Sequence, residues 1–315
     1  MFVGNTARRR VLSLDDFMNN YIRILRPNHW VKNFAVLLPL VFAMKINSVR
    51  SCVAGCIAAA VFCLVSSFVY IVNDIKDRQQ DRLHPHKRNR PIASGQIGDN
   101  QALTVAIILV VCSLLWAYIS VPAVLPFVGA YIGLQLIYSF GLKKVVLLDV
   151  ICIAMGFVIR ASAGAAAIGV EISPWLFICM FTVCLFMGFC KRYNERAAFA
   201  NQGQAQMHRG TLMDYTPELL THLVTLSAGL AVISFISYSM SPLTIAHFGS
   251  EKLVYTLPVV VYAVFRFAMI SMRGIYEGPT EIILHDKPFI AAALIWSVWV
   301  FAVINWNMIS SAVNL

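Results

Sequence analysis

Four polar side chains at the end of a long apolar run form the strongest chemical pattern in this sequence. Asn73, Asp77 and Asp81 are spaced four residues apart, and Asp74 adjoins the first of them. On a helix this spacing places the first three along one face, with Asp74 beside them. Such hard oxygen ligands suit Mg²⁺ when phosphate groups complete its coordination. The competing interpretation is a solvated helix end whose acids pair with arginines of the same segment.

Basic side chains follow these acids and recur where later apolar runs end. They suit the phosphates of a substrate, and the alternative is the usual excess of positive charge on the cytoplasmic side of a membrane protein. The candidates are Lys87, Arg88 and Arg90 in a turn-rich loop, Tyr138 with Lys143 after one apolar run, and Lys191 with Arg192 after another.

Two further cations lie inside the apolar runs or at their entry. Arg160 falls in the middle of a run, and a membrane-buried arginine is costly enough to be a functional candidate by default. Structural pairing is the alternative. Lys32 stands where the first run begins, so its side chain can snorkel to the surface or point between the helices.

The elements that position these residues are predicted to be membrane helices. The chain has 315 residues, is 59% hydrophobic and carries only 13% charged residues, which is too apolar for a soluble protein of this length. We expect an all-α, polytopic membrane protein with one domain over residues 1–315. A cytoplasmic N-terminal segment with an interfacial helix is expected over 1–28. Nine spans of roughly 17–25 residues fit the sequence at 29–46, 51–73, 101–119, 122–141, 145–168, 174–191, 217–238, 253–271 and 288–310.

Charge placement orients these spans. Most Lys and Arg residues fall on one side of the nine-span arrangement, which predicts a cytoplasmic N-terminus and an outside C-terminus in the inner (plasma) membrane. The long polar loops after the second and sixth spans lie on the same side, so the active site is expected at the cytoplasmic face. The net charge of +10 does not indicate nucleic-acid binding, because the basic residues stand at span ends. No histidine or cysteine shows metal-ligand spacing.

The acid pattern at the end of a second span resembles the UbiA superfamily of membrane prenyltransferases. Several stretches are similar to its decaprenyl-phosphate phosphoribosyltransferase branch, and together they cover about residues 20–200. They are Leu25–Asn33, Tyr70–Asp77, the run from His84 through Ala93, Tyr138–Lys143, the fifth span through Arg160, and Gly188–Glu195. The resemblance implies a helical bundle with a Mg²⁺-dependent transferase site.

One departure from the wider superfamily separates its branches. Typical members carry a second aspartate-rich motif at the end of the sixth span, whereas this chain has Lys191-Arg192-Tyr193-Asn194-Glu195 there. A prenyl diphosphate has one anionic end. Phosphoribosyl pyrophosphate has a diphosphate and a separate 5-phosphate, and a polyprenyl phosphate acceptor adds a third anion. One metal site with several cations suits that set of substrates.

The resemblance therefore implies transfer of 5-phosphoribose from phosphoribosyl pyrophosphate to a polyprenyl (decaprenyl) phosphate, for arabinan precursors of a bacterial cell wall. Mg²⁺ would be held by Asn73 and Asp77. Asp74, Asp77, Asp81 and Lys191 are the expected catalytic residues. The expected substrate-binding residues are Lys32, Tyr70, Lys87, Arg90, Tyr138, Lys143, Arg160, Lys191 and Arg192.

Two alternative functions stay open beside this interpretation. Assembly into a homo-oligomer is also left open. The first alternative function is a prenyltransferase of the same superfamily that uses a prenyl diphosphate, which would need a second acid cluster. The second is a transporter without chemistry, which would need paired polar residues along a path through the bilayer. Within the phosphoribosyltransferase interpretation, Lys32 and Arg160 are candidates for binding the lipid phosphate or for placing positive charge beside the ribose ring.

Overall fold

The computed structural model describes residues 14–83, 87–171, 174–200, 211–276 and 278–304, and within these ranges the regular structure is entirely helical. Seven helical segments are long and apolar enough to cross a membrane. They contain α3 (Val49–Lys76), α5 (Asp99–Ser120), α6 (Leu125–Phe140), α7 (Leu148–Ala167), α8 (Pro174–Ala200), α10 (Pro217–Ser239) and α12 (Leu257–Met272). The all-α membrane architecture expected from composition is confirmed.

The first and last expected spans take a different form. Residues 27–42 fold as a 3₁₀ helix, η1 (Pro27–Leu37), followed by the short α2 (Leu38–Phe42). The final apolar helix, α14 (Lys287–Ile304), is shorter than the seven long segments. The described residues therefore do not confirm a count of nine. Residues 1–13 of the expected N-terminal segment and 305–310 of the expected ninth span lie outside the described residues.

Short helices connect the long ones. Near the acid motif these are α1 (Leu14–Leu25), α4 (Arg78–Leu83) and η2 (Lys87–Asn89); η3 (Pro122–Val124) and η4 (Leu142–Lys144) flank α6. In the second half they are α9 (Thr211–Asp214), α11 (Pro242–Phe248), η6 (Lys252–Thr256) and α13 (Pro279–His285). Side-chain caps begin two of the long helices: Ser48 accepts a hydrogen bond from the Ser51 backbone N–H, and Thr216 accepts one from Leu219.

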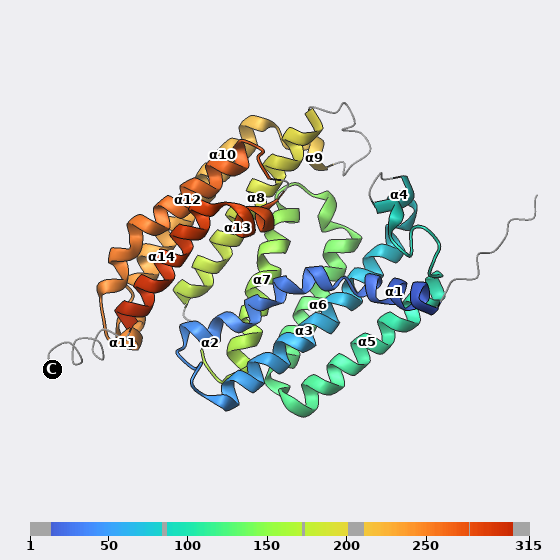
Figure 1. Cartoon of the computed structure of the whole chain (residues 1–315), viewed down its shortest axis with the longest axis horizontal. Helices are drawn as coiled ribbons and strands as arrows, with labels where there is room; N and C mark the ends of the chain where they lie inside the picture. Colours follow the sequence, from blue (N-terminus) through green and yellow to red (C-terminus); the bar gives the residue numbers. More distant parts are fainter. Residues whose placement is uncertain (1–13, 84–86, 172–173, 201–210, 277, 305–315) are drawn as a thin grey trace, which may run out of the picture.

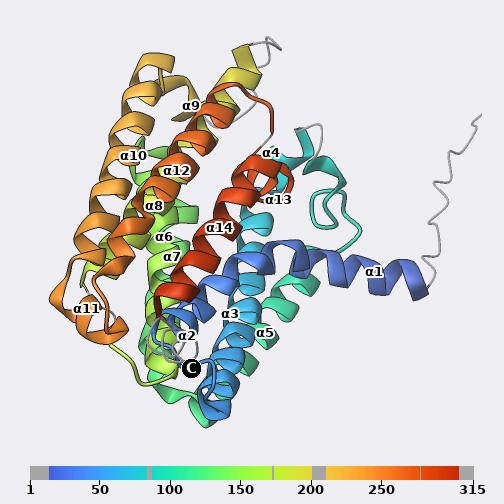
Figure 2. The same cartoon turned by 60° about the vertical axis from the view of Figure 1, so that its left-hand side comes forward.

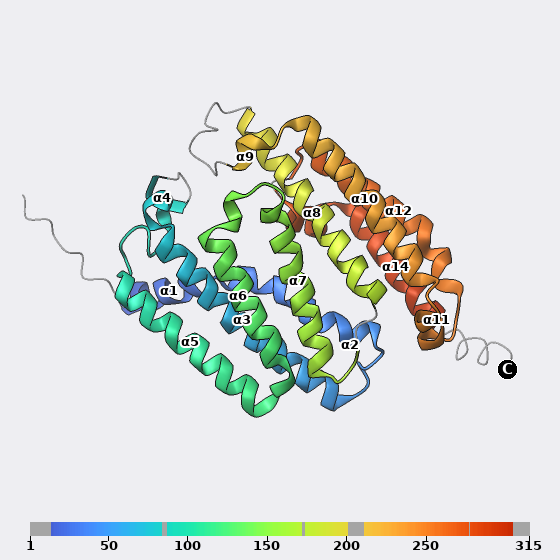
Figure 3. The ribbon, with the colours of Figure 1, turned by 180° about the vertical axis from the view of Figure 1, so that it is seen from behind.

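The long helices form two groups, as Figure 1 and the reverse view in Figure 3 show. The first group packs α3 against α5, α6 and α7, and the second packs α8 against α10 and α12, with α14 on α12. Contact between α7 and α8 joins the groups. Each group has its own apolar core, the first around Phe62 and Tyr131 and the second around Phe186 and Phe267.

The 3₁₀ helix η1 packs closely against the first helix group. It packs against both α3 and α7, and the turned view in Figure 2 shows the chain running from α1 to α2 across α3. Gly164 on α7 permits this approach, because a Cβ placed there would lie 1.8 Å from the carbonyl oxygen of Val36. Any side chain at this position would push η1, and with it Lys32 and Asn33, away from α7.

Candidate active site

The acid motif spans the junction between α3 and α4. Helix α3 ends at Lys76, and Asp77 caps it with its backbone N–H bonded to the carbonyl of Asn73. The Asp81 N–H in turn bonds to the carbonyl of Asp77. The backbone thus keeps its four-residue spacing through the junction, but the side chains do not form the single face expected from sequence. They divide into two pairs, each gathered around its own cation.

The first pair is Asn73 and Asp77, which share the ammonium group of Lys143. Its Nζ lies 2.6 Å from each carboxylate oxygen of Asp77 and 3.4 Å from Asn73 Oδ1. Lys143 belongs to η4, after α6, so this contact links two loops that are far apart in sequence. The three oxygen atoms converge on one position for a cation.

The second pair is Asp74 and Asp81, which share the guanidinium of Arg90. Arg90 Nη1 lies 3.1 Å from Asp74 Oδ1 and 2.6 Å from Asp81 Oδ2. Asp74 also forms an ion pair with Arg26, the residue between α1 and η1. Both carboxylates are buried, so these arginines offset a desolvation cost that unpaired acids could not bear. Sequence spacing did not point to Arg26, which approaches from outside the motif.

These residues fit one divalent metal at Asn73 and Asp77. Both are oxygen donors of the type that Mg²⁺ takes in combination with substrate phosphates, and Lys143 Nζ already places a positive charge between them. Asp74 and Asp81 fit it less well, because arginines occupy their oxygens. Among the described residues, no group of three or more His, Cys, Asp or Glu side chains could hold a metal by protein ligands alone, so substrate oxygens would have to complete the coordination.

An aromatic and cationic layer lies beside the Asp74 pair. Tyr70 packs against His29 with the two rings tilted by 46° at a centroid distance of 5.3 Å, and the Arg26 guanidinium lies 5.2 Å from the Tyr70 ring centroid. Burial, followed by the charges of Lys32, Arg26, Lys191 and Arg90, lowers the pKa of His29 to about 4. Cations on η1, on α8 and in the loop after α4 therefore lie within electrostatic range of His29.

In the C-terminal half of α8, two adjacent cations have different surroundings. The side chain of Lys191 is 48% exposed and lies 3.7 Å from Glu195. Arg192 is buried, with Nε 2.8 Å from Asp149 Oδ2 in an ion pair that lacks hydrogen-bond alignment, and it also pairs with Glu195. Asp149 accepts a further hydrogen bond of 2.7 Å from the Tyr215 hydroxyl. Arg192 is therefore part of a structural network that joins α7, α8 and the start of α10.

Arg160 sits in a polar network in the interior of the first helix group. Its Nε donates to Asn33 Oδ1 at 2.7 Å, one Nη donates to the Tyr131 hydroxyl at 2.7 Å, and the other donates to the Gly156 carbonyl at 2.9 Å. Asn33 also accepts from Ser66 at 3.2 Å. All of these partners are uncharged.

The two other expected residues, Lys87 and Tyr138, lie near these clusters. Lys87 is half-buried in η2, which packs against α4. Tyr138 is half-buried near the end of α6 and lies within electrostatic range of Arg192. The structure thus places most of the predicted residues near the ends of α3 and α6, on the short elements that follow these helices, and on α8. Sequence reasoning missed Arg26, His29 and Asp149. Arg26 precedes the expected spans, His29 is the first residue of the first one, and Asp149 is a single acid at a helix start.

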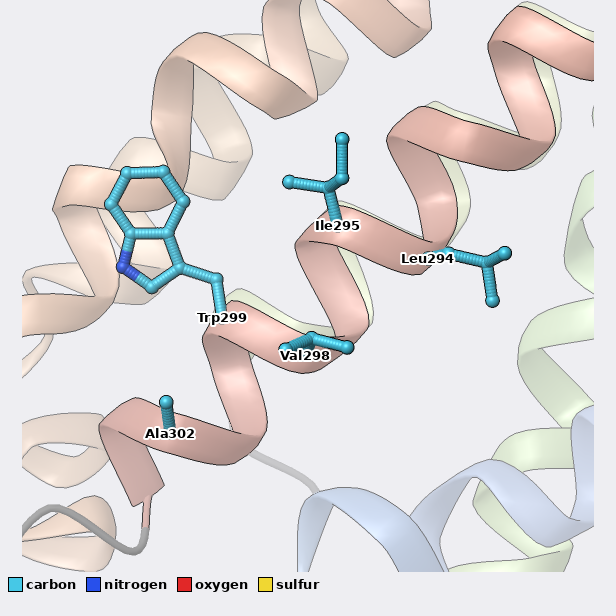
Figure 4. A pocket seen from close by; sticks show the side chains of 5 residues that line it. All are labelled: Leu294, Ile295, Val298, Trp299 and Ala302. Carbon is cyan, nitrogen blue, oxygen red and sulfur yellow. The ribbon is translucent and has the colours of Figure 1, made fainter. Parts of the chain in front are cut away.

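An apolar groove of about 490 Å³ lies along α14, away from these charged clusters. Figure 4 shows the side chains that line it, Leu294, Ile295, Val298, Trp299 and Ala302, spaced along one helix. Its lining contains no charged group, as expected for a surface that contacts lipid chains.

The sequence and the fold are both similar to those of known proteins. Residues 34–274 match the model of the UbiA prenyltransferase family. The chain is 35% identical over 298 residues to decaprenyl-phosphate phosphoribosyltransferase of Corynebacterium glutamicum, covering 93% of this chain and 88% of the relative. It is 33% identical to the Mycobacterium tuberculosis protein of that name, covering 91% and 94%. Its fold is similar to a UbiA homologue from Archaeoglobus fulgidus solved with GPP and Mg²⁺, with a TM-score of 0.64 at 19% identity, covering 91% of this chain and 99% of that one.

Proposed function

The chain belongs to the UbiA prenyltransferase family, and we propose that it transfers 5-phosphoribose from phosphoribosyl pyrophosphate to a polyprenyl phosphate, releasing diphosphate. One observation carries the choice within the family. Asn73 and Asp77 offer an oxygen-lined position for a metal, the oxygens of Asp74 and Asp81 are held by arginines, and α8 presents Lys191 and Arg192 where a second group of acids would stand. A donor with two separate phosphate groups needs more cations than a prenyl diphosphate does.

In this reaction the bond between the anomeric carbon and the diphosphate breaks, and an oxygen of the polyprenyl phosphate forms the new bond to that carbon. Asn73 and Asp77 would hold Mg²⁺, which neutralises charge on the departing diphosphate. Lys143 would leave Asp77 for a phosphate oxygen as the metal-bound donor enters. Lys87 and Arg90 would stabilise the leaving group.

The remaining cations divide by their surroundings. Lys191 is exposed and can reach the 5-phosphate of the donor, whereas Arg192 is committed to Asp149 and Glu195. We therefore revise the expectation that Arg192 binds substrate, and propose that it positions Lys191. A strong general base is not required, because a phosphate monoester is largely ionised near neutral pH.

The cellular setting follows from charge placement and from the names of the relatives. We propose an inner-membrane enzyme with its N-terminus in the cytoplasm and its C-terminus outside. Phosphoribosyl pyrophosphate is water-soluble, so the acid motif would face the cytoplasm. The lipid product would supply arabinan precursors for the cell wall.

The test is transfer of labelled phosphoribose to polyprenyl phosphate by the purified protein. We expect Asp77→Ala to lower transfer at least about a hundredfold, because it removes a metal ligand at the leaving group. Asp99→Asn is the matched control, since Asp99 pairs with Arg78 at the start of α5 and lies outside the site. Full activity of Asp77→Ala with Mg²⁺ would refute the metal assignment. Product from a prenyl diphosphate donor instead would favour the prenyltransferase alternative.

A further inference from the structure

Several buried or half-buried cations around the site have a carboxylate partner. Arg26 and Arg90 pair with Asp74, Lys143 with Asp77, and Arg192 with Asp149. Away from the site, Arg266 pairs with Asp286 in the same way. Within the described part of the chain, Lys32 on η1 and Arg160 on α7 depart from this pattern, and Arg196 on α8 donates to a backbone carbonyl, that of Tyr215.

Arg160 is only 4% exposed and holds its charge among neutral groups. Three of its five N–H donors reach Asn33, Tyr131 and Gly156. Its guanidinium also lies 4.5 Å from the Tyr131 ring centroid. These contacts fix its orientation but do not neutralise it, and a buried arginine without an anion is costly.

Lys32 adds a second positive charge within electrostatic range of Arg160. It precedes Asn33 on η1, and Asn33 accepts the hydrogen bond from Arg160 Nε. Across the described residues, no hydrogen bond or ion pair to Lys32 is found. Burial, followed by the charges of Arg160 and Arg26, lowers the pKa of Lys32 to about 8. Because the two cations are partly desolvated and repel each other, a bound anion would stabilise both of them.

We propose that Lys32 and Arg160 together bind the phosphate of the polyprenyl phosphate acceptor, an inference that rests on the proposed function. A phosphate monoester carries close to two negative charges, which matches the two cations. The guanidinium has further N–H donors available for its oxygens. The position also favours the lipid over the soluble donor, because Arg160 lies within a membrane span while the diphosphate site is at the end of α3.

The shared chemistry of a phosphate monoester also fits the 5-phosphate of the donor, so the experiment must separate the two sources. Initial rates of transfer are measured for Lys32→Met with each substrate varied in turn. Lys45→Met is the matched control, since Lys45 is an exposed lysine outside the site. We expect the apparent KM for polyprenyl phosphate to rise at least about tenfold, with the KM for phosphoribosyl pyrophosphate within about twofold of wild type. Lys32→Arg should restore much of the loss.

A binding arm without the donor keeps the inference separate from the proposed reaction. Wild-type protein should bind polyprenyl phosphate at least about tenfold more tightly than polyprenol of the same length, and Lys32→Met should lose most of that preference. Arg160→Lys, which keeps the charge but not the guanidinium, should weaken it as well. If the wild-type protein transfers no phosphoribose, the proposed function fails. The binding measurement alone then decides whether Lys32 and Arg160 bind the lipid phosphate.

Two results would overturn the assignment. A rise in KM confined to phosphoribosyl pyrophosphate would assign the pair to the 5-phosphate of the donor. An unchanged preference for the phosphorylated lipid in folded Lys32→Met and Arg160→Lys would show that the acceptor phosphate binds elsewhere.

Discussion

At the scale of single residues, burial decides what a cation can do. Lys191 and Arg192 are neighbours in the chain and have the same formal charge, yet their side chains are 48% and 3% exposed. An exposed ammonium can exchange water for a substrate phosphate at little cost. A buried guanidinium paired with Asp149 and Glu195 cannot move to a substrate without leaving the buried carboxylate of Asp149 unpaired.

This difference predicts opposite behaviour for two neighbouring substitutions. We expect Arg192→Met to lower the free energy of unfolding by about 3–5 kcal/mol, because Asp149 would be left as an unpaired buried charge. Lys191→Met should leave thermal stability nearly unchanged while lowering phosphoribose transfer. Thermal unfolding in detergent and the transfer assay measure the two effects. Equal thermal stability of the two variants would contradict the structural role of Arg192.

The sequence allowed the acid motif to be found, but not its division into two pairs. Helical spacing relates Asn73 to Asp77 and Asp81 because that relation is local. Whether Lys143 or Arg90 neutralises a given acid depends on loops that fold back from other parts of the chain. Arg26 could not be assigned for the same reason, since its partner Asp74 lies on the next long helix.

At the scale of elements, η1 packs against α7 and carries Lys32 of the proposed acceptor site together with Asn33, which accepts a hydrogen bond from Arg160. Lys32 and Asn33 keep their positions only while Gly164 leaves space for Val36. Hydropathy predicted the seven long helices because their apolar length is a property of each segment. It predicted an ordinary span at 29–46 where the chain forms a 3₁₀ helix and a short α-helix, because packing against α3 and α7 shapes this segment.

We therefore expect Gly164→Ala to be damaging despite its small size. The added methyl group would collide with the Val36 carbonyl, and overpacking of this kind costs about 1–3 kcal/mol. Thermal unfolding should show reduced stability, and the displaced η1 should raise the KM for polyprenyl phosphate. Gly129→Ala on α6 is the matched control, since its Cβ would meet nothing within 4 Å. If the two variants have the same stability and KM, η1 does not depend on this close approach.

At the scale of the whole molecule, charge is distributed unevenly between a largely apolar interior and polar helix ends. The chain carries a net charge of +10, and Arg26, Arg90 and Lys143 reach the acid motif from three different parts of the chain. Both proposed substrates are anions. The molecule thus combines a local metal position with a broader positive potential, and the two should respond differently to salt.

Ionic strength separates long-range attraction from contacts inside the site. The Debye length falls from about 30 Å at 0.01 M salt to about 8 Å at 0.15 M, so salt screens the approach of a soluble anionic donor more than it weakens partly buried ion pairs. In uncharged detergent, we expect added NaCl to lower kcat/KM for phosphoribosyl pyrophosphate several-fold between these concentrations, while kcat changes much less. Potassium glutamate at equal ionic strength controls for specific chloride effects. A fall in kcat with kcat/KM unchanged would mean that salt acts on the bound complex, and that the positive surface does not steer the donor.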